Sequence, residues 1–258
     1  MQKWMRIALS LALVAWLGCD EKATDPQSGK GTLRIFLTDA VAMYDAVNIT
    51  FTEVSAHIDG KWETLSNQTR TVNLLEWNSG KALMLGQAEV EAGKYTQLRL
   101  KIADAEIVLK GQAYPLDVPS GAQSGLKLLT KFDIIAGSTY DLVIDFDAER
   151  SIVVTGPRQR PNGFKLKPVL RVAAMALTGS ISGTVTNPAD LPVAYAIAGA
   201  DTITSSPVNG TTGFFRLAFL PPDSYTVSVS DTLNKAFTQS GVTVTAGQDN
   251  SLGQVTLQ

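Results

Sequence analysis

The sequence predicts an all-β protein built from two antiparallel β-sandwich domains. Three observations lead to this fold class: apolar and polar residues alternate along most of the chain, dipeptides typical of tight hairpins separate the alternating segments, and the composition changes near residue 178. Residues 32–38 and 96–102 show the alternation most plainly. The apolar face of these two strands is expected to comprise Leu33, Ile35, Leu37, Leu98, Leu100 and Ile102.

The first residues resemble an export leader followed by a flexible segment. Lys3 and Arg6 precede an uncharged run of 11 residues, 7–17, whereas a membrane-spanning helix needs about 20. Residues 20–30 are polar and acidic, and none of their apolar side chains is larger than that of alanine. We therefore expect residues 1–18 to be a signal peptide and residues 19–30 to be a disordered tether.

Cys19 is the only cysteine of the chain, so it has no partner for an internal disulfide. Leu17, Gly18 and Cys19 resemble the end of a bacterial lipoprotein box, with Trp16 at a position where that family usually has leucine. The resemblance implies that Cys19 becomes the lipidated, palmitate-bearing first residue of a lipoprotein. The protein would then be exported and anchored in the cell envelope, at the periplasmic or surface face of the outer membrane. The tether has a reach of about 17–20 Å, which would keep the folded part close to the bilayer.

Residues 31–175 are expected to form the first β domain. Tight hairpin turns are predicted at Asp59-Gly60 and Gly111-Gln112, and residues 73–88 are the one segment expected to be helical or irregular. Tyr95, Tyr140 and Tyr225 each follow a turn and open an alternating strand. This pattern predicts structural corners, in which the ring is buried and the hydroxyl bonds to backbone.

Residues 178–258 have a different composition and are expected to form a second, smaller domain. They are rich in Ser, Thr, Gly and Val, contain no tryptophan, and have Arg216 and Lys235 as their only cations. The segments ISGTV at 181–185, TGFF at 212–215 and LPPDSYTV at 220–227 resemble the carboxypeptidase regulatory-like family. That resemblance implies a prealbumin-like, seven-stranded sandwich with a carbohydrate-binding-like fold and no catalytic activity.

The first domain also resembles a known family. The segments LTDA at 37–40, YDAVNITFTEVSAHIDGKWETL at 44–65, LLEWNSGKALMLGQAEVEAGKYTQLRL at 74–100, IDFDAERSIV at 144–153 and KLKPVLRV at 165–172 are similar to domain of unknown function 4382. The resemblance implies a β domain of exported bacterial or archaeal lipoproteins. It implies no activity.

The charge balance argues against nucleic acid as a partner. The whole chain has a net charge of −2, and without residues 1–18 the balance is 20 Lys and Arg against 24 Asp and Glu. No basic patch is evident in the sequence, whereas nucleic acid binding demands clustered cations. The expected partners are the membrane, through the lipid on Cys19, and an envelope protein or glycan.

The sequence offers few of the residue combinations that catalytic sites require. His57 is the only histidine, lipidation would consume Cys19, and no Gly-x-Ser-x-Gly motif occurs. We therefore interpret His57 as a surface residue of a strand and expect the protein not to be an enzyme.

The most suggestive polar group follows Tyr140. If residues 140–149 form one extended strand, Asp145, Asp147 and Glu149 share a face, and Asp39 would join them if the two strand ends meet. Ca²⁺ would relieve the repulsion among these carboxylates. The preferred alternative is ion pairing with nearby cations, and a carboxylate-based hydrolase is the least favoured. The cations in question are Arg150, Lys165, Lys167 and Arg171.

Glycan binding is the remaining specific hypothesis. Trp62 follows a predicted hairpin glycine and is the candidate stacking platform, whereas Trp77 lies in an apolar cluster and is expected to be buried. The sequence thus predicts a non-catalytic envelope lipoprotein that acts as a ligand-binding or assembly module. A carbohydrate-binding or calcium-dependent surface protein is the main alternative.

Overall fold

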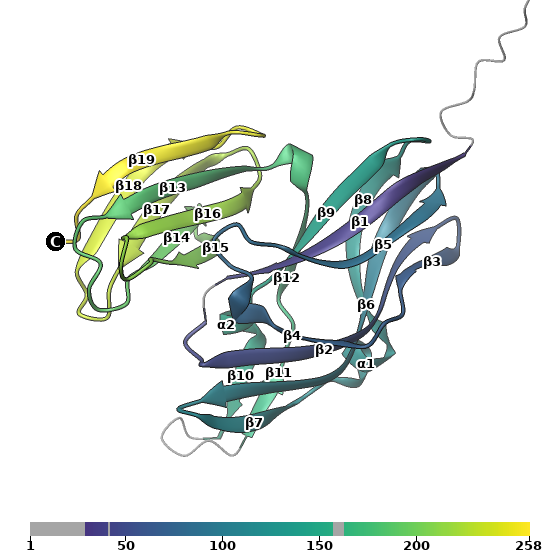
Figure 1. Cartoon of the computed structure of the whole chain (residues 1–258), viewed down its shortest axis with the longest axis horizontal. Coiled ribbons are helices and arrows are strands. Elements are labelled where there is room, and N and C mark those ends of the chain that lie inside the picture. Colours follow the sequence, from purple (N-terminus) through teal and green to yellow (C-terminus); the bar gives the residue numbers. More distant parts are fainter. Residues whose placement is uncertain (1–28, 41, 157–162) are drawn as a thin grey trace, which may run out of the picture.

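The computed structural model of the chain describes residues 29–40, 42–156 and 163–258. The predicted signal peptide, the lipidation residue Cys19 and nearly all of the predicted tether lie outside these ranges. Figure 1 shows two β-sandwiches side by side, with the start of β1 and the C-terminus at opposite ends of the molecule. The predicted all-β sandwich class is confirmed.

The first sandwich packs two sheets face to face. One sheet has the order β12-β9-β1-β5, and the other has the order β10-β11-β7-β6-β2-β3, with β4 also paired to β2 and β8 to β6. The bounds in the smaller sheet are β12 Leu170–Ala174, β9 Thr139–Phe146, β1 Lys30–Asp39 and β5 Leu83–Glu91. Those in the larger sheet are β10 Ile152–Thr155, β11 Gly163–Leu166, β7 Gln112–Asp117, β6 Gly93–Leu109, β2 Ala46–Ile58, β3 Lys61–Ser66, β4 Arg70–Asn73 and β8 Leu126–Ile134.

The second sandwich has seven strands in two sheets, ordered β16-β13-β19 and β15-β14-β17-β18. Their bounds are β13 Gly179–Val185, β14 Val193–Ala198, β15 Asp201–Pro207, β16 Phe214–Leu220, β17 Ser224–Ser230, β18 Ala236–Thr243 and β19 Asp249–Val255. Short helical turns complete the described chain, namely η1 Leu74–Glu76, α1 Ser120–Gly125, α2 Ala148–Ser151 and η2 Met175–Leu177.

Most strand pairs are antiparallel, but the sheets are mixed. β1 runs parallel to β9, β11 to β7, and β13 to β19. The antiparallel arrangement predicted from the hairpin signals is therefore incomplete, because these pairs join strands that are distant in the sequence and that no hairpin connects.

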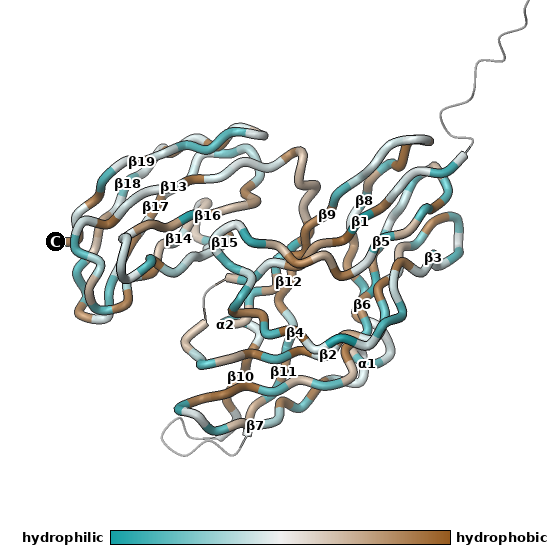
Figure 2. Tube along the Cα trace, in the orientation of Figure 1, coloured by the Kyte–Doolittle hydropathy of each residue, from teal (hydrophilic) through white to brown (hydrophobic). Residues whose placement is uncertain are grey.

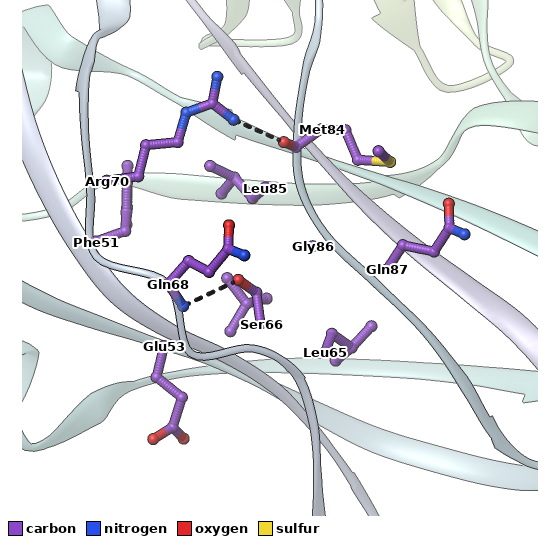
Figure 3. Close-up of a pocket in the computed structure, with 11 residues that line it drawn as sticks. Phe51, Glu53, Leu65, Ser66, Gln68, Arg70, Met84, Leu85, Gly86 and Gln87 are labelled. Carbon is purple, nitrogen blue, oxygen red and sulfur yellow. Dashed lines mark hydrogen bonds between the residues drawn. The ribbon is translucent and has the colours of Figure 1, made fainter.

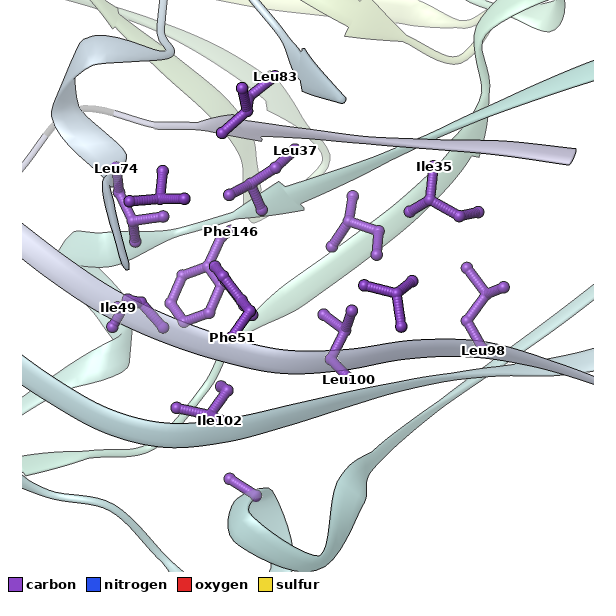
Figure 4. Packing of buried hydrophobic residues seen from close by; sticks show 14 of the residues in the cluster. Ile35, Leu37, Ile49, Phe51, Leu74, Leu83, Leu98, Leu100, Ile102 and Phe146 are labelled. Carbon is purple, nitrogen blue, oxygen red and sulfur yellow. The ribbon is translucent and has the colours of Figure 1, made fainter. Parts of the chain in front are cut away.

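Each sandwich has its own apolar core, which is formed by the apolar residues that alternate with polar ones along the strands. Figure 2 shows hydrophobic and hydrophilic positions alternating along the strands. In the first core, Ile35 and Leu37 of β1 meet Leu98 and Leu100 of β6 between the sheets, with Phe146 of β9 beside them (Figure 4). A separate cluster, centred on residues such as Phe215 and Val227, fills the second sandwich.

The predicted turns are largely confirmed. Asp59 and Gly60, both with positive φ, connect β2 to β3. The turn between β6 and β7 lies one residue earlier than expected, at Lys110 and Gly111, which have φ values of 52° and 74°. Two consecutive left-handed residues are what a two-residue hairpin of this type requires.

Two of the three tyrosine corners are confirmed. The Tyr95 hydroxyl donates to the Glu91 carbonyl at 2.9 Å, and the Tyr225 hydroxyl donates to the Pro221 carbonyl at 2.8 Å. Burial raises the pKa of Tyr95 to about 12, so the hydroxyl stays a donor. Tyr140 instead stacks its ring on that of Phe132, with the centroids 5.4 Å apart.

The segment 73–88 is irregular only in its first half. After η1, the chain crosses the end of β1, where the Thr38 hydroxyl donates to the carbonyls of Trp77 and Lys81 at 2.8 and 2.9 Å. From Leu83 the chain is strand β5, paired with β1. The expectation of a helix or loop through residue 88 is wrong there, because pairing with β1 overrides the clustered apolar pattern. Among the described residues, no helix has the length and apolar character to cross a membrane.

Candidate functional site

The predicted acidic group lies where the first sandwich faces the second. Because β1 and β9 run parallel, Thr38 is opposite Asp145 and Asp39 is opposite Phe146. The ends of the two strands therefore meet, but Asp39 shares its face of the sheet with Phe146, whereas Asp145 shares the opposite face with Thr38. The expected row of three carboxylates on one extended strand is wrong, since β9 ends at Phe146 and α2 begins at Ala148. Asp147 caps that helix by accepting from the Arg150 amide at 2.8 Å.

Each acid of the group has a different partner. Asp145, which is buried, pairs with Arg171 at 2.7 Å, and Asp147 pairs with Arg150 at 2.6 Å. The exposed Glu149 accepts from the backbone amide of Met43 at 3.1 Å. Asp145 and Asp147 thus pair with two of the four cations named in the ion-pairing interpretation, Asp145 across strands and Asp147 within one helical turn.

Asp39 differs from the other acids because it is almost fully buried. Its Oδ1 accepts from the Ala148 amide at 3.0 Å, while its Oδ2 has no hydrogen-bond partner among the described residues. Burial raises the pKa of Asp39 well above its usual 3.8, and the charges of Asp145 and Asp147 raise it further. Asp39 is therefore disposed to hold a proton at a pH where an exposed aspartate has lost it.

The geometry of this group does not assemble a metal centre. Within residues 29–40, 42–156 and 163–258, no cluster of three or more His, Cys, Asp or Glu side chains is placed to hold a metal ion. Asp145 and Asp147 turn their carboxylates to arginines instead. The described residues therefore give no support to calcium ligation by Asp39, Asp145, Asp147 and Glu149.

Asp39→Asn is expected to stabilise the protein at neutral pH. A raised acid pKa means that the folded state keeps a proton that the unfolded state releases above pH 3.8, so stability falls as pH rises toward the folded pKa. The amide resembles the protonated acid and abolishes that loss. Denaturant unfolding from pH 4 to pH 8 should show the gap between variant and wild type widening with pH.

Asp249→Asn is the control, because its expected effect on stability at neutral pH is opposite to that of Asp39→Asn. Burial alone would raise the pKa of Asp249, but hydrogen bonds from Ser180 and Ser182 outweigh it and lower that pKa. The variant should therefore lose stability at neutral pH relative to the wild type. If both variants shifted stability in the same direction, our assignment of the Asp39 proton would be wrong.

The two sandwiches meet through side chains on either side of the acidic group. Arg171 Nη1 donates to the Phe219 carbonyl of β16 at 2.7 Å, while its Nη2 holds Asp145. Farther along, the hydroxyls of Ser79 and Ser206 lie 3.0 Å apart. Arg171 therefore links a buried charge of the first sandwich to the backbone of the second.

A groove of about 510 Å³ opens between the two sandwiches. Tyr44 and Tyr195 contribute half-buried rings from opposite walls, and the exposed side chains of Met43 and Leu191 lie beside them. Burial raises the pKa of both tyrosines, and the charge of Glu149, which accepts from the Met43 backbone amide, adds to the effect. The other residues that line the groove are Ala42, Asp45, Pro192, Val193, Pro207, Val208, Ser230, Asp231 and Thr232.

A smaller hollow of about 300 Å³ lies where β5 passes β3 and β4 (Figure 3). Arg70 reaches across it to the Met84 carbonyl at 3.3 Å, and the backbone amide of Gln68 donates to the Ser66 hydroxyl at 3.3 Å. The Arg70 contact joins β4 to β5, and the Gln68 contact fixes the turn between β3 and β4. We therefore interpret the hollow as a gap between packed strands at the edge of the sandwich, and we do not treat it as the main candidate for a ligand site.

The predicted stacking residue Trp62 is half-buried on the outer face of the larger sheet. The Arg99 guanidinium carbon lies 4.3 Å from its ring centroid, and the His57 ring lies 5.0 Å away at 59°. His57 Nδ1 is 3.1 Å from the Thr96 hydroxyl, so the histidine belongs to a strand surface. Trp77 is also half-buried and packs against the first core.

The expectation that no basic patch exists is wrong for the folded chain. Strand register places Lys94, Arg99 and Lys101 of β6 beside Lys127 and Lys131 of β8 on the outer face of the larger sheet. These cations alternate with buried apolar residues in two segments separated by 25 residues or more. A linear reading shows no run of charge, because only antiparallel pairing brings the segments together.

The residues of the groove were also missed. Tyr44 and Leu191 are about 150 positions apart, and neither carries a motif. A proline and an exposed leucine before β14 are weak signals by themselves. Only the packing of two sandwiches makes a groove from them.

Comparisons with known proteins agree with this two-part organisation. Residues 30–168 match the family described as domain of unknown function (DUF4382), and residues 180–258 match the carboxypeptidase regulatory-like domain. Among curated proteins, no match was found.

Solved structures show only distant likeness. The TIE protein of Bacillus anthracis is 10% identical with a TM-score of 0.25, covering 89% of this chain and 51% of that one, so this chain spans about half its length. The minor pilin GBS52 of Streptococcus agalactiae is 8% identical with a TM-score of 0.22, covering 87% and 94%. The major pilin subunit BcpA of Bacillus cereus is 9% identical with a TM-score of 0.20, covering 89% and 69%.

TM-scores at this level assign neither function nor partner. The family matches, in contrast, span most of the described residues and occur in the predicted order. The chain therefore belongs to the domain of unknown function (DUF4382) family and has a carboxypeptidase regulatory-like domain behind that first domain.

Proposed function

We propose that this chain is a non-catalytic lipoprotein of the cell envelope that binds a ligand in the groove between its two sandwiches. The lipid on Cys19 would hold it at the outer membrane, facing the periplasm or the cell surface. The observation that carries the ligand-binding role is the groove of about 510 Å³, with a tyrosine from each sandwich. Apolar pockets at domain junctions with a few polar groups are the usual place for small ligands.

The absence of a catalytic arrangement among the described residues supports a binding role. His57 lies on an open sheet face beside a threonine hydroxyl. Asp145 and Asp147 are each paired with an arginine, and Asp39 is buried, which leaves Glu149 as the one exposed carboxylate of that group without an ion pair among the described residues. A glycoside hydrolase needs two working carboxylates about 5 to 9.5 Å apart, so the hydrolase alternative has no support here.

The chemistry of the groove favours a neutral glycan as the ligand. Two tyrosine rings offer flat apolar faces with hydroxyls at their rims, a combination that suits sugar rings. The nearby carboxylates of Asp45, Asp231 and Glu149 accept hydrogen bonds and repel anionic ligands. A neutral sugar chain satisfies both conditions.

Tyr44→Ala and Tyr195→Ala are each expected to weaken glycan binding by roughly thirtyfold, the effect of losing about 2 kcal/mol at a central aromatic contact. Binding would be measured by calorimetry on the detergent-extracted protein, after a thermal-shift screen of neutral and acidic oligosaccharides. Trp62→Ala is the matched control, because Trp62 lies on the outer sheet face, away from the groove. If Trp62→Ala abolished binding while both tyrosine variants bound normally, the groove assignment would be refuted.

A further inference from the structure

The outer face of the larger sheet in the first sandwich has a composition unlike the rest of the chain. Cross-strand register aligns residues from β3, β2, β6 and β8 in rows on this face. Neighbouring strands lie about 4.8 Å apart, so four residues in a row span about 14 Å. The first row is Trp62, His57, Gln97 and Leu129, and the second is Thr64, Ser55, Arg99 and Lys127.

Cations outnumber anions where residues 94–101 of β6 lie beside residues 127–133 of β8 on this face, although the chain as a whole has a net charge of −2. Arg99 and Lys101 both pair with Glu53 at 2.6 Å. Lys94, Lys127 and Lys131 make no ion pair among the residues that the structure describes. Asp133 lies opposite Lys94, whereas Asp104 and Glu106 lie farther along β6 on the same face, opposite Thr50 and Asn48 of β2. The surplus of positive charge is therefore carried by three exposed lysines.

An apolar side chain projects among these lysines. Leu129 is 85% exposed and lies two residues from both Lys127 and Lys131 on the same strand. A leucine that protrudes this far from a sheet, with lysines on both sides, has no packing role within the described chain. Apolar side chains flanked by lysines are well suited to the boundary between lipid headgroups and acyl chains.

The chain enters the fold beside this same strand. Gly29 accepts from the Ala92 amide at 2.8 Å, and Lys30 accepts from the Gly137 amide at 2.8 Å, just after β8. Ile135, at that junction, is 57% exposed. Figure 1 shows the start of β1 at the same end of the molecule as β3 and β8, opposite the C-terminus. The 11 residues between Cys19 and Gly31 reach about 17–20 Å, so this face would lie within reach of the bilayer.

We propose that the face formed by Trp62, Lys94, Leu129 and the lysines around it rests on an anionic lipid surface next to the lipid anchor. The proposal rests on the lipidation of Cys19 put forward above. An acyl anchor and a basic patch act together in peripheral membrane proteins, because each lysine near an anionic surface strengthens membrane partitioning about fivefold. The second sandwich and the groove would then be held away from the bilayer.

The test uses the lipidated full-length protein, reconstituted into vesicles of phosphatidylcholine alone or mixed with phosphatidylglycerol. An impermeant amine reagent and mass spectrometry report the labelling of each lysine. We expect Lys94, Lys127 and Lys131 to be protected several-fold in the anionic vesicles, and the protection to vanish at about 1 M salt, where the Debye length is about 3 Å. Lys110 and Lys235, which are exposed elsewhere, serve as internal controls that label equally in both vesicles.

A variant with Lys127→Glu and Lys131→Glu should lose the protection of Lys94, and Leu129→Ser should weaken it. Equal labelling of the three lysines in both vesicle types would overturn the proposal. Protection by a soluble acidic polysaccharide but not by anionic vesicles would also overturn it, since the face would then be a glycan site. Failure of lipidation is distinguishable, because the wild-type protein would then incorporate no labelled palmitate and would not be recovered with membranes.

Discussion

Replacing Arg171 with methionine is expected to lower the free energy of unfolding by about 3 kcal/mol, because the change leaves the Asp145 carboxylate buried without a counter-charge. The Asp145 side chain is 5% exposed and that of Arg171 is 24% exposed, so water screens the pair only weakly. Methionine retains most of the aliphatic volume, so loss of packing is a minor part of the effect. Urea denaturation followed by circular dichroism would measure the change.

Arg150→Met is the matched control for this prediction. It removes an arginine from Asp147 in the same acidic group, but the Arg150 side chain is 50% exposed. The expected cost is below about 1 kcal/mol. Adding Asp145→Asn to Arg171→Met should recover part of the loss, since the buried charge is then gone. Equal destabilisation by the two arginine variants would contradict this explanation.

Arg171→Met should also uncouple the sandwiches. In the wild type, Arg171 donates to the Phe219 carbonyl of the second sandwich while it holds Asp145 of the first. Without that link, we expect differential scanning calorimetry to resolve two transitions where the wild type gives one. A single transition in the variant would show that the remaining contacts suffice.

Replacing Cys19 with alanine is expected to abolish palmitate incorporation and recovery of the mature protein with membranes. Cys19 is the only thiol in the sequence, so no other cysteine is available to accept the lipid. Metabolic labelling with palmitate, followed by membrane fractionation, measures both effects directly. Labelled palmitate on the alanine variant would refute the lipoprotein assignment.

Trp16→Leu is the matched control for Cys19. It changes a residue in the same segment toward the leucine usual in lipoprotein boxes, so palmitate labelling should equal or exceed that of the wild type. If the two variants behaved alike, the loss of label in Cys19→Ala would reflect damage to the leader rather than loss of the thiol.

Local sequence signals predicted much of the fold because they act over a few residues. Strand alternation correctly assigned Leu33, Ile35 and Leu98 to the core, all with 0% exposure. A turn followed by a tyrosine correctly predicted the corners at Tyr95 and Tyr225. Backbone geometry and burial of alternate side chains determine both features, and they require no knowledge of distant partners.

The errors occurred where a distant partner decides the outcome. Residues 83–88 became a strand because β1 offers an edge to pair with. The strand β9 stopped before Asp147 because that side chain caps a helical turn, and the expected row of acids was thereby dispersed. In each case local preference was weak, and a contact formed by another part of the chain outweighed it.

The sequence by itself determined that this protein is all-β, that its composition changes near residue 178, and that its one thiol follows an apolar run of residues. Only the tertiary structure decided that Asp39 is buried against the Ala148 amide, that Tyr44 and Tyr195 face one groove, and that five cations share one face. The physical reason is that alternation specifies which side of a strand is buried, whereas the pairing of strands specifies which outward side chains become neighbours.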